Sequence, residues 1–137
     1  MDQFNSVISE YDAKTAEIVS AFKKAAAILK DHDPNTKINL QIVVGDEVMA
    51  VAKQAVQQGK EVVELRKRAQ DIAQGLNGAE KDQAEKVLQD RTTSAKTTIE
   101  AGIKQVYTLL EPYKSVLGSS YEQIKDQVKQ TFPNLNV

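Results

Sequence analysis

The sequence lacks cysteine and tryptophan, and proline, glycine and aromatic residues are few. Without cysteine the chain has no disulfide framework, no thiolate nucleophile and no zinc site built on sulfur. No apolar run approaches the roughly 18 residues of a membrane span. The first residues, Met1 to Phe4, do not form the basic start of a signal peptide. These absences leave the compartment open, including whether the chain is the mature part of a longer secreted or surface protein.

The sequence also lacks an excess of charge of either sign. It has 18 basic and 19 acidic residues, and its net charge at pH 7 is −1. A chain without a positive field lacks the electrostatic attraction that drives general binding to nucleic acids. Aromatic side chains are absent from residues 23 to 106, so this stretch offers no platform on which bases could stack. We therefore expect no nucleic-acid partner.

The residues that are present favour helices. Alanine and glutamine are abundant among the 137 residues, and a chain of this length is typical of one domain. The prolines and glycines divide the chain into segments. Pro112 is expected to kink or end the third of them. These breaks predict one domain, residues 1–137, with helices at about residues 4–30, 34–74, 78–111 and 120–131 and a disordered tail at 133–137.

Hydrophobic residues recur at alternating spacings of four and three along these segments, as on one face of a helix. The first stripe consists of Phe4, Ile8, Tyr11, Thr15, Ile18, Phe22, Ala25 and Leu29. Residues 38–44 have a rival interpretation, because their β-branched residues alternate as in a strand. A strand needs a partner, and no second segment alternates in this way, so we favour a helix here as well.

Short connections between long amphipathic helices require neighbours that run in opposite directions. The sequence therefore predicts an all-α fold, an elongated antiparallel (up-down-up-down) coiled-coil-like bundle of three long helices and a short fourth helix. The first helix is shorter than the second, so residues 61–93 are expected to project as a two-helix arm. Two questions stay open: whether the second helix is broken at Gly45 or Gly59, and whether two arms pair into a homodimer.

Candidate catalytic and metal-binding residues are few. Asp31, Asp33 and Asn35 have the spacing of the first three ligands of a calcium loop, but Thr36 and Ile42 stand where the loop needs glycine and a bidentate acid. We interpret Asp33 as a helix cap before Pro34. His32 is the only histidine, and the paired carboxylates lie on polar helical faces where nothing shifts their pKa values. We expect no enzyme, no metal site and no cofactor.

Two weaker patterns remain. Arg66, Lys67 and Arg68 form the only run of three like charges, and Arg91 falls at a similar height on the third helix. We expect these four residues to form a basic docking patch, with the two facing arginines turned outward or met by Asp2 or by a partner's carboxylates. Small residues also recur along the second and third helices, which indicates close packing or an interior loose enough for an apolar ligand: Gly45, Ala52, Gly59, Ala95 and Gly102.

These observations favour a non-enzymatic helical-bundle interaction protein, of the surface, effector or scaffold type, that binds another protein through a helical face. The alternative is an exchangeable helical bundle that binds lipid or a membrane surface by opening at its loops. The alanine-rich middle of the chain lacks the wide, bulky apolar face typical of such lipid binders, which favours the first hypothesis.

Overall fold

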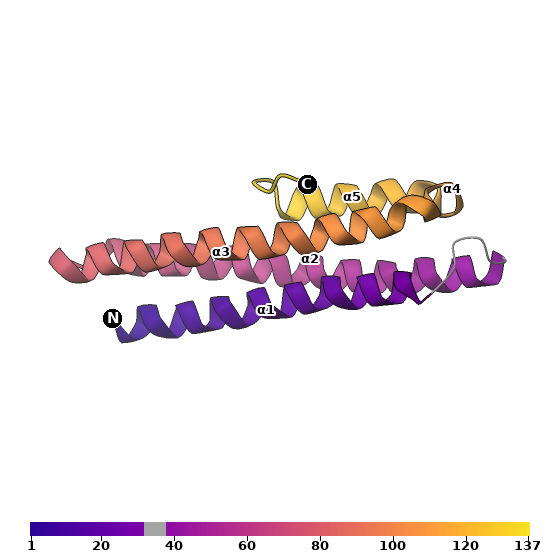
Figure 1. Cartoon of the computed structure of the whole chain (residues 1–137). Helices are drawn as coiled ribbons and strands as arrows, with labels where there is room; N and C mark the ends of the chain where they lie inside the picture. The colour runs from indigo at the N-terminus through magenta and orange to yellow at the C-terminus, as the bar shows by residue number, and fades with distance from the viewer. Residues whose placement is uncertain (32–37) are drawn as a thin grey trace.

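The computed structural model describes residues 1–31 and 38–137, and their side chains except those of residues 38–45 and 116. The described residues form helices and no strand, so the predicted all-α bundle of three long helices and a short one is confirmed (Figure 1). The elements are α1 (Asp2–Lys30), α2 (Ile38–Gln74), α3 (Gly78–Leu110), the 3-10 turn η1 (Glu111–Tyr113), α4 (Lys114–Leu117) and α5 (Ser119–Thr131).

Helix α2 includes the segment 38–44 that alternates like a strand. An isolated strand would leave its backbone groups without a ladder, whereas a helix satisfies them internally. The helix is continuous through Gly45 and Gly59, and its 37 residues extend about 55 Å. The expected start of this helix, at Pro34, lies outside the described residues.

Side-chain contacts define the register of the three long helices. Lys14 Nζ of α1 lies 2.9 Å from Glu61 Oε2 of α2. Gln58 Nε2 of α2 donates a hydrogen bond to Glu17 Oε2 of α1 at 3.1 Å, so these two helices run antiparallel. On α3, Arg91 Nη1 lies 3.1 Å from Asp12 Oδ2, which brings the beginnings of α1 and α3 side by side. Helices α1 and α3 therefore run in the same direction.

The predicted two-helix arm at 61–93 is wrong, because α1 covers most of it. The contacts of Asp12 and Lys14 place the first half of α1 along this segment. Phe4 of α1 and Ala84 of α3 are both completely buried, so packing continues almost to the hairpin turn (Figure 1). The prediction counted residues from the connection between α1 and α2. The position of α1 along the α2–α3 hairpin is instead decided by the apolar stripe of α1. This stripe begins at Phe4, and its first residues are buried only if α1 lies against the hairpin.

The predicted apolar stripe of α1 is confirmed, with all of its members buried except the half-buried Thr15. Its bulky side chains pack against small residues of the other helices, including Ala69, Ala73 and Ala95. At Gly102, a Cβ would lie 3.2 Å from the Cβ of Phe22, so glycine lets α3 approach α1 closely.

Helix α5 runs in the same direction as α2 and covers only one half of the α2–α3 pair (Figure 1). Its end meets the middle of α2 at Gly59. A Cβ on Gly59 would lie 2.5 Å from Thr131 Cγ2 and 2.6 Å from Phe132 Cζ. The absence of a side chain at Gly59 is therefore what lets the end of α5 lie against α2.

The turns differ in detail from the sequence-based expectation. Pro112 ends α3 at Leu110, as expected. At the hairpin Gly78 has a positive φ of 59°, and Gly118 has a positive φ of 55° before α5. The tail 133–137 was expected to be disordered. In the structure the Asn136 N–H donates to Glu100 Oε1 of α3 at 2.9 Å.

Candidate functional site

The four basic residues of the predicted docking patch do not share one face. Consecutive residues of a helix point about 100° apart, so Arg66, Lys67 and Arg68 diverge around α2. Arg66 is half-buried and faces α3, whereas Lys67 lines a separate groove between α2 and α5. Arg68 and Arg91 are exposed. The structure brings Arg66 and Arg91 to the same level of α1 and leaves the other two apart from them.

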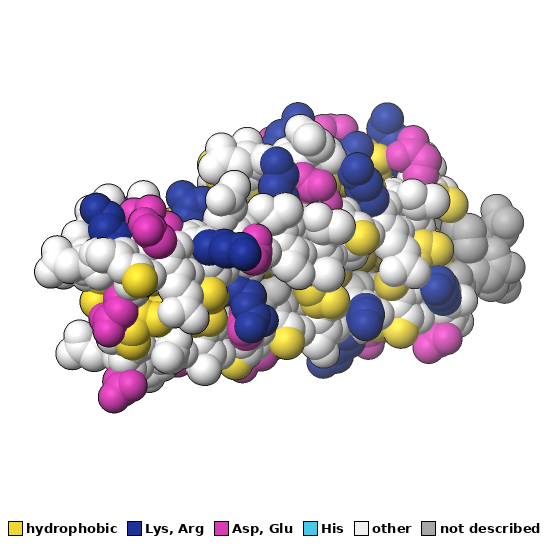
Figure 2. All heavy atoms as spheres, turned by 60° about the vertical axis from the view of Figure 1, so that its left-hand side comes forward, with side chains coloured by type: hydrophobic (Ala, Val, Ile, Leu, Met, Phe, Trp, Pro, Cys, Tyr) yellow, Lys and Arg dark blue, Asp and Glu magenta, His cyan; other side chains and the backbone are white. Residues whose placement is uncertain are grey.

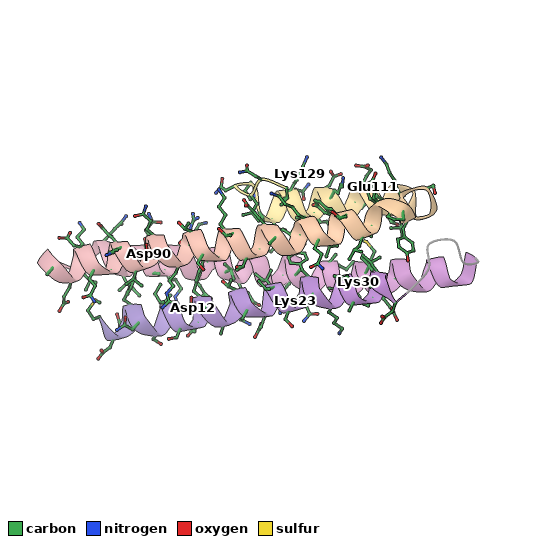
Figure 3. All side chains as sticks on the ribbon, in the orientation of Figure 1. Asp12, Lys23, Lys30, Asp90, Glu111 and Lys129 are labelled. Atoms are coloured by element: carbon green, nitrogen blue, oxygen red, sulfur yellow. The ribbon has the colours of Figure 1, made fainter. Side chains whose placement is uncertain are left out.

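Arg91 has an ion-pair partner within the chain. Its guanidinium contacts the carboxylate of Asp12, not that of Asp2 as the sequence suggested. Figure 3 shows Asp12 of α1 across from Asp90, the neighbour of Arg91 on α3. Both side chains of the pair are about half-exposed, and such a pair contributes about 1 kcal/mol or less. Arg91 is thus a surface link between α1 and α3.

Arg66 is different, because it is half-buried and forms no ion pair with any described residue. It lies near Tyr11, whose buried ring is packed between the helices. Burial raises the pKa of Tyr11, while a hydrogen bond with Thr92 and the charge of Arg66 lower it in part. A half-buried guanidinium without a carboxylate partner is a group that an acidic side chain would stabilise.

Arg66 stands at the edge of a groove of about 380 Å³ between α2 and α3. We call this the distal groove. It is lined by Arg66, Gln70, Ala73 and Gln74 of α2 and by Glu85, Leu88, Gln89, Thr92 and Thr93 of α3. Apart from Arg66 and Glu85, these side chains are neutral, and most can donate or accept hydrogen bonds.

The distal groove continues the surface that α5 covers in the other half of the molecule. Val63 and Lys67 line the groove next to α5, and Gln70 and Gln74 follow them at the spacing of one helical face. Helix α5 ends level with Gly59, and beyond the short C-terminal loop that follows it no helix of the described chain covers this face (Figure 1). The sequence analysis missed the groove. The signal was the length of the fourth helix, which is too short to follow α2 to the hairpin.

A second cluster holds α5 against α3. Lys125 Nζ lies 4.8 Å from the centroid of the Tyr121 ring and 5.2 Å from that of Tyr107. The Tyr121 hydroxyl donates to Glu111, and this hydrogen bond lowers the pKa of Glu111. The Tyr107 hydroxyl is buried without a hydrogen-bond partner among the described residues, and burial raises its pKa to about 12. The charges of Lys125 and Glu111 are therefore accounted for by contacts that hold α5 in place.

The structure offers no preformed interior site for an apolar ligand in the region where four helices meet. The space enclosed there by α1, α2, α3 and α5 is about 10 Å³, no more than one water molecule needs. Side chains of neighbouring elements lie close to Gly59 and Gly102, as expected for close helix packing. His32, Asp33 and Asn35 lie outside the described residues. Within the described part of the chain, no three potential ligand residues gather as a metal site would require.

Hydrophobic side chains reach the surface where α1 begins and the α2–α3 hairpin turns (Figure 2). The partly buried hydrophobic residues of this end are Met1, Ile72, Leu76, Val87 and Leu88. Elsewhere on the face shown in Figure 2, basic and acidic side chains are scattered among polar atoms and smaller hydrophobic patches. None of the described helices is long and apolar enough to cross a membrane.

Comparisons of this chain with protein-family models, with curated proteins and with solved structures found no match.

Proposed function

We propose that the chain is a non-enzymatic interaction protein that binds another protein through a helical face. The observation that carries this proposal is the distal groove, where the face covered by α5 continues uncovered and includes an unpaired, half-buried Arg66. A helix laid in a groove between two helices is a common mode of protein recognition. In this chain α5 already occupies the other half of the same face in that way.

The partner should carry acidic side chains, because Arg66 lines the distal groove and Lys67 lines the adjoining groove next to α5. Contacts between exposed charges weaken as salt shortens the screening length from about 10 Å at 0.1 M to about 3 Å at 1 M. Capture of the partner from the native source should therefore fall as salt rises.

Reversal of charge tests the surface directly. The variant Arg66→Glu/Lys67→Glu/Arg68→Glu should lose the partner while its circular dichroism and melting temperature stay near those of the wild type. The matched control is Lys23→Glu/Lys24→Glu/Lys30→Glu, which changes the net charge equally on the exposed side of α1. Capture that survives the first variant would contradict the proposal and direct attention to the surface around Tyr107, Tyr113 and Tyr121.

The second candidate is binding to lipid or a membrane surface, and the exposed hydrophobic end at Met1 and Leu76 favours it. Because the four-helix interior is closely packed, a lipid could enter there only if the helices separated. Anionic vesicles distinguish the two candidates. A change in far-ultraviolet helicity and gel-filtration volume on adding vesicles would support lipid binding, and no change would favour the protein partner.

A further inference from the structure

The shape of the molecule bears on what could fill the distal groove. Helix α5 has 13 residues and is about 20 Å long. The part of α2 that continues past the end of α5, residues 60–74, is about 22 Å long by the same rise per residue, and its first residues line the groove next to the end of α5. The bundle is therefore four helices thick in one half and three helices thick in the other, with the step near the middle of α2. Two such bodies turned end for end are complementary in shape.

The outer face of α5 is suited in charge to the groove. Its exposed residues include Glu122 near its beginning, Asp126 in its middle and Lys129 near its end. Figure 3 shows Lys129 on the side of α5 turned away from the rest of the bundle. None of the three forms an ion pair with another described residue. These charges are available to a partner, as is Arg66.

We propose that the occupant of the distal groove is a second copy of this chain, turned end for end, with the outer face of α5 of each copy lying over the groove of the other. This inference rests on the proposed function, since it names the protein that the same groove binds. The contact is symmetric, so each copy contributes one α5 and one groove, and the dimer closes without leaving a free groove.

The register follows from the meeting of α5 with Gly59. If the twofold axis passes at that level, α5 of one copy runs antiparallel to α2 of the other. Both helices rise about 1.5 Å per residue, so Glu122 comes level with Arg68 and within one turn of Arg66. By the same count Asp126 comes level with Glu64 and within one turn of Lys67, so Glu122 and not Asp126 is the acidic residue best placed for Arg66. Arg66, which lies on the same face of α2 as Gly59, thus comes near Glu122 of the other copy, and this residue supplies the carboxylate that Arg66 lacks among the described residues of its own chain.

Sedimentation or light scattering over a series from about 1 μM to about 1 mM tests the dimer. The measured mass should double along the series, and the transition should move to higher concentration when salt is raised. A chain that stays monomeric throughout would overturn the second copy as occupant. The proposed function would still be tested separately, by whether a different protein is captured and whether that capture is lost on charge reversal.

A charge exchange tests the register. Glu122→Lys and Arg66→Glu should each weaken dimerisation about tenfold, because each change occurs twice in a symmetric dimer. The combined variant Glu122→Lys/Arg66→Glu should recover most of the loss, since it restores opposite charges. The control is Glu10→Lys, an exposed reversal on α1 that should leave dimerisation unchanged. Circular dichroism of each variant checks that α5 stays folded. A dimer insensitive to both single changes, or weakest in the combined variant, would overturn the proposal.

Discussion

At the scale of single residues, Phe22 shows how the bundle gains its stability. The ring is 5 % exposed, and it packs against the backbone of α3 at Gly102, where no side chain intervenes. This contact joins α1 and α3. A side chain at position 102 would crowd Phe22 and push the two helices apart. The sequence placed Phe22 in the middle of its stripe, and the structure adds the glycine that receives it.

We expect Phe22→Ala to lower the free energy of unfolding by about 3–5 kcal/mol, the usual loss when a buried phenylalanine leaves a cavity. Urea unfolding measures this loss. Lys23→Ala, at the exposed neighbouring position, is the control and should change the free energy by no more than about 0.5 kcal/mol. Equal stability of the two variants would mean that Phe22 is not part of the core.

Tyr107 supplies a test by pH. Burial raises its pKa from the ordinary 10.0 to about 12 in the folded protein. The unfolded chain therefore releases this proton at lower pH than the folded chain does. The contribution of Tyr107 to stability is fully present below pH 10 and is lost as the pH rises toward 12.

The free energy of unfolding should accordingly fall between pH 10 and pH 12, and Tyr107→Phe should fall less over that interval. At neutral pH this variant should be as stable as the wild type or slightly more stable, because it removes a buried hydroxyl that has no partner. Urea unfolding at several pH values measures both effects. The same alkaline loss in both proteins would show that Tyr107 titrates normally.

At the scale of the elements, the position of α5 depends on one glycine of α2. A helix can lie this close to α2 only where the facing residue has no side chain, and Gly59 provides that position. The cluster of Lys125, Tyr107 and Tyr121 then fixes α5 against α3. Two neighbouring helices therefore hold α5 by different means, close packing on one side and cation–aromatic contacts on the other.

Gly59→Ala should destabilise the protein by about 1–3 kcal/mol, because its Cβ would overlap Thr131 and Phe132 and force α5 outward. This happens even though alanine favours a helix more than glycine does. The matched control is Gly75→Ala, where a Cβ would meet only backbone oxygens at ordinary distances of 3.5 and 3.8 Å. Thermal melting compares the two. A stabilised Gly59→Ala variant would show that α5 does not lie against Gly59.

At the scale of the whole molecule, the bundle is long because its helices are long. Helices α1, α2 and α3 each have about 29 to 37 residues, and they lie side by side along most of their length (Figure 1). The short α5 thickens only one half. This shape exposes more surface for its mass than a sphere would, and the face in Figure 2 carries scattered charges of both signs.

Far-ultraviolet circular dichroism should give more than about 70 % helix, well above the roughly one third typical of soluble domains. Sedimentation at low concentration should give a frictional ratio above that of a sphere of the same mass. Substantial strand content, especially from residues 38–44, or a compact frictional ratio would contradict the bundle described here.

Local patterns were enough to predict the helices. The stripe from Phe4 to Leu29 and the break at Pro112 depend on the spacing of side chains and on backbone sterics, which act within one or two turns. The sequence therefore determined the all-α class, the order of the long helices and most of the core of α1. Finer features of the turns were less predictable, because Gly75 and Gly78 both suit a left-handed position and only Gly78 adopts a positive φ at this turn.

The tertiary structure alone decided how far α1 slides along the hairpin and where α5 ends. Both depend on contacts between residues far apart in sequence, Lys14 with Glu61 and Gly59 with Phe132, which no local spacing encodes. The basic run was visible in the sequence, but its division among different faces follows from the orientation of α2 between α3 and α5. The distal groove also depends on the tertiary structure, because it is formed by the spacing between α2 and α3 and by the point at which α5 ends.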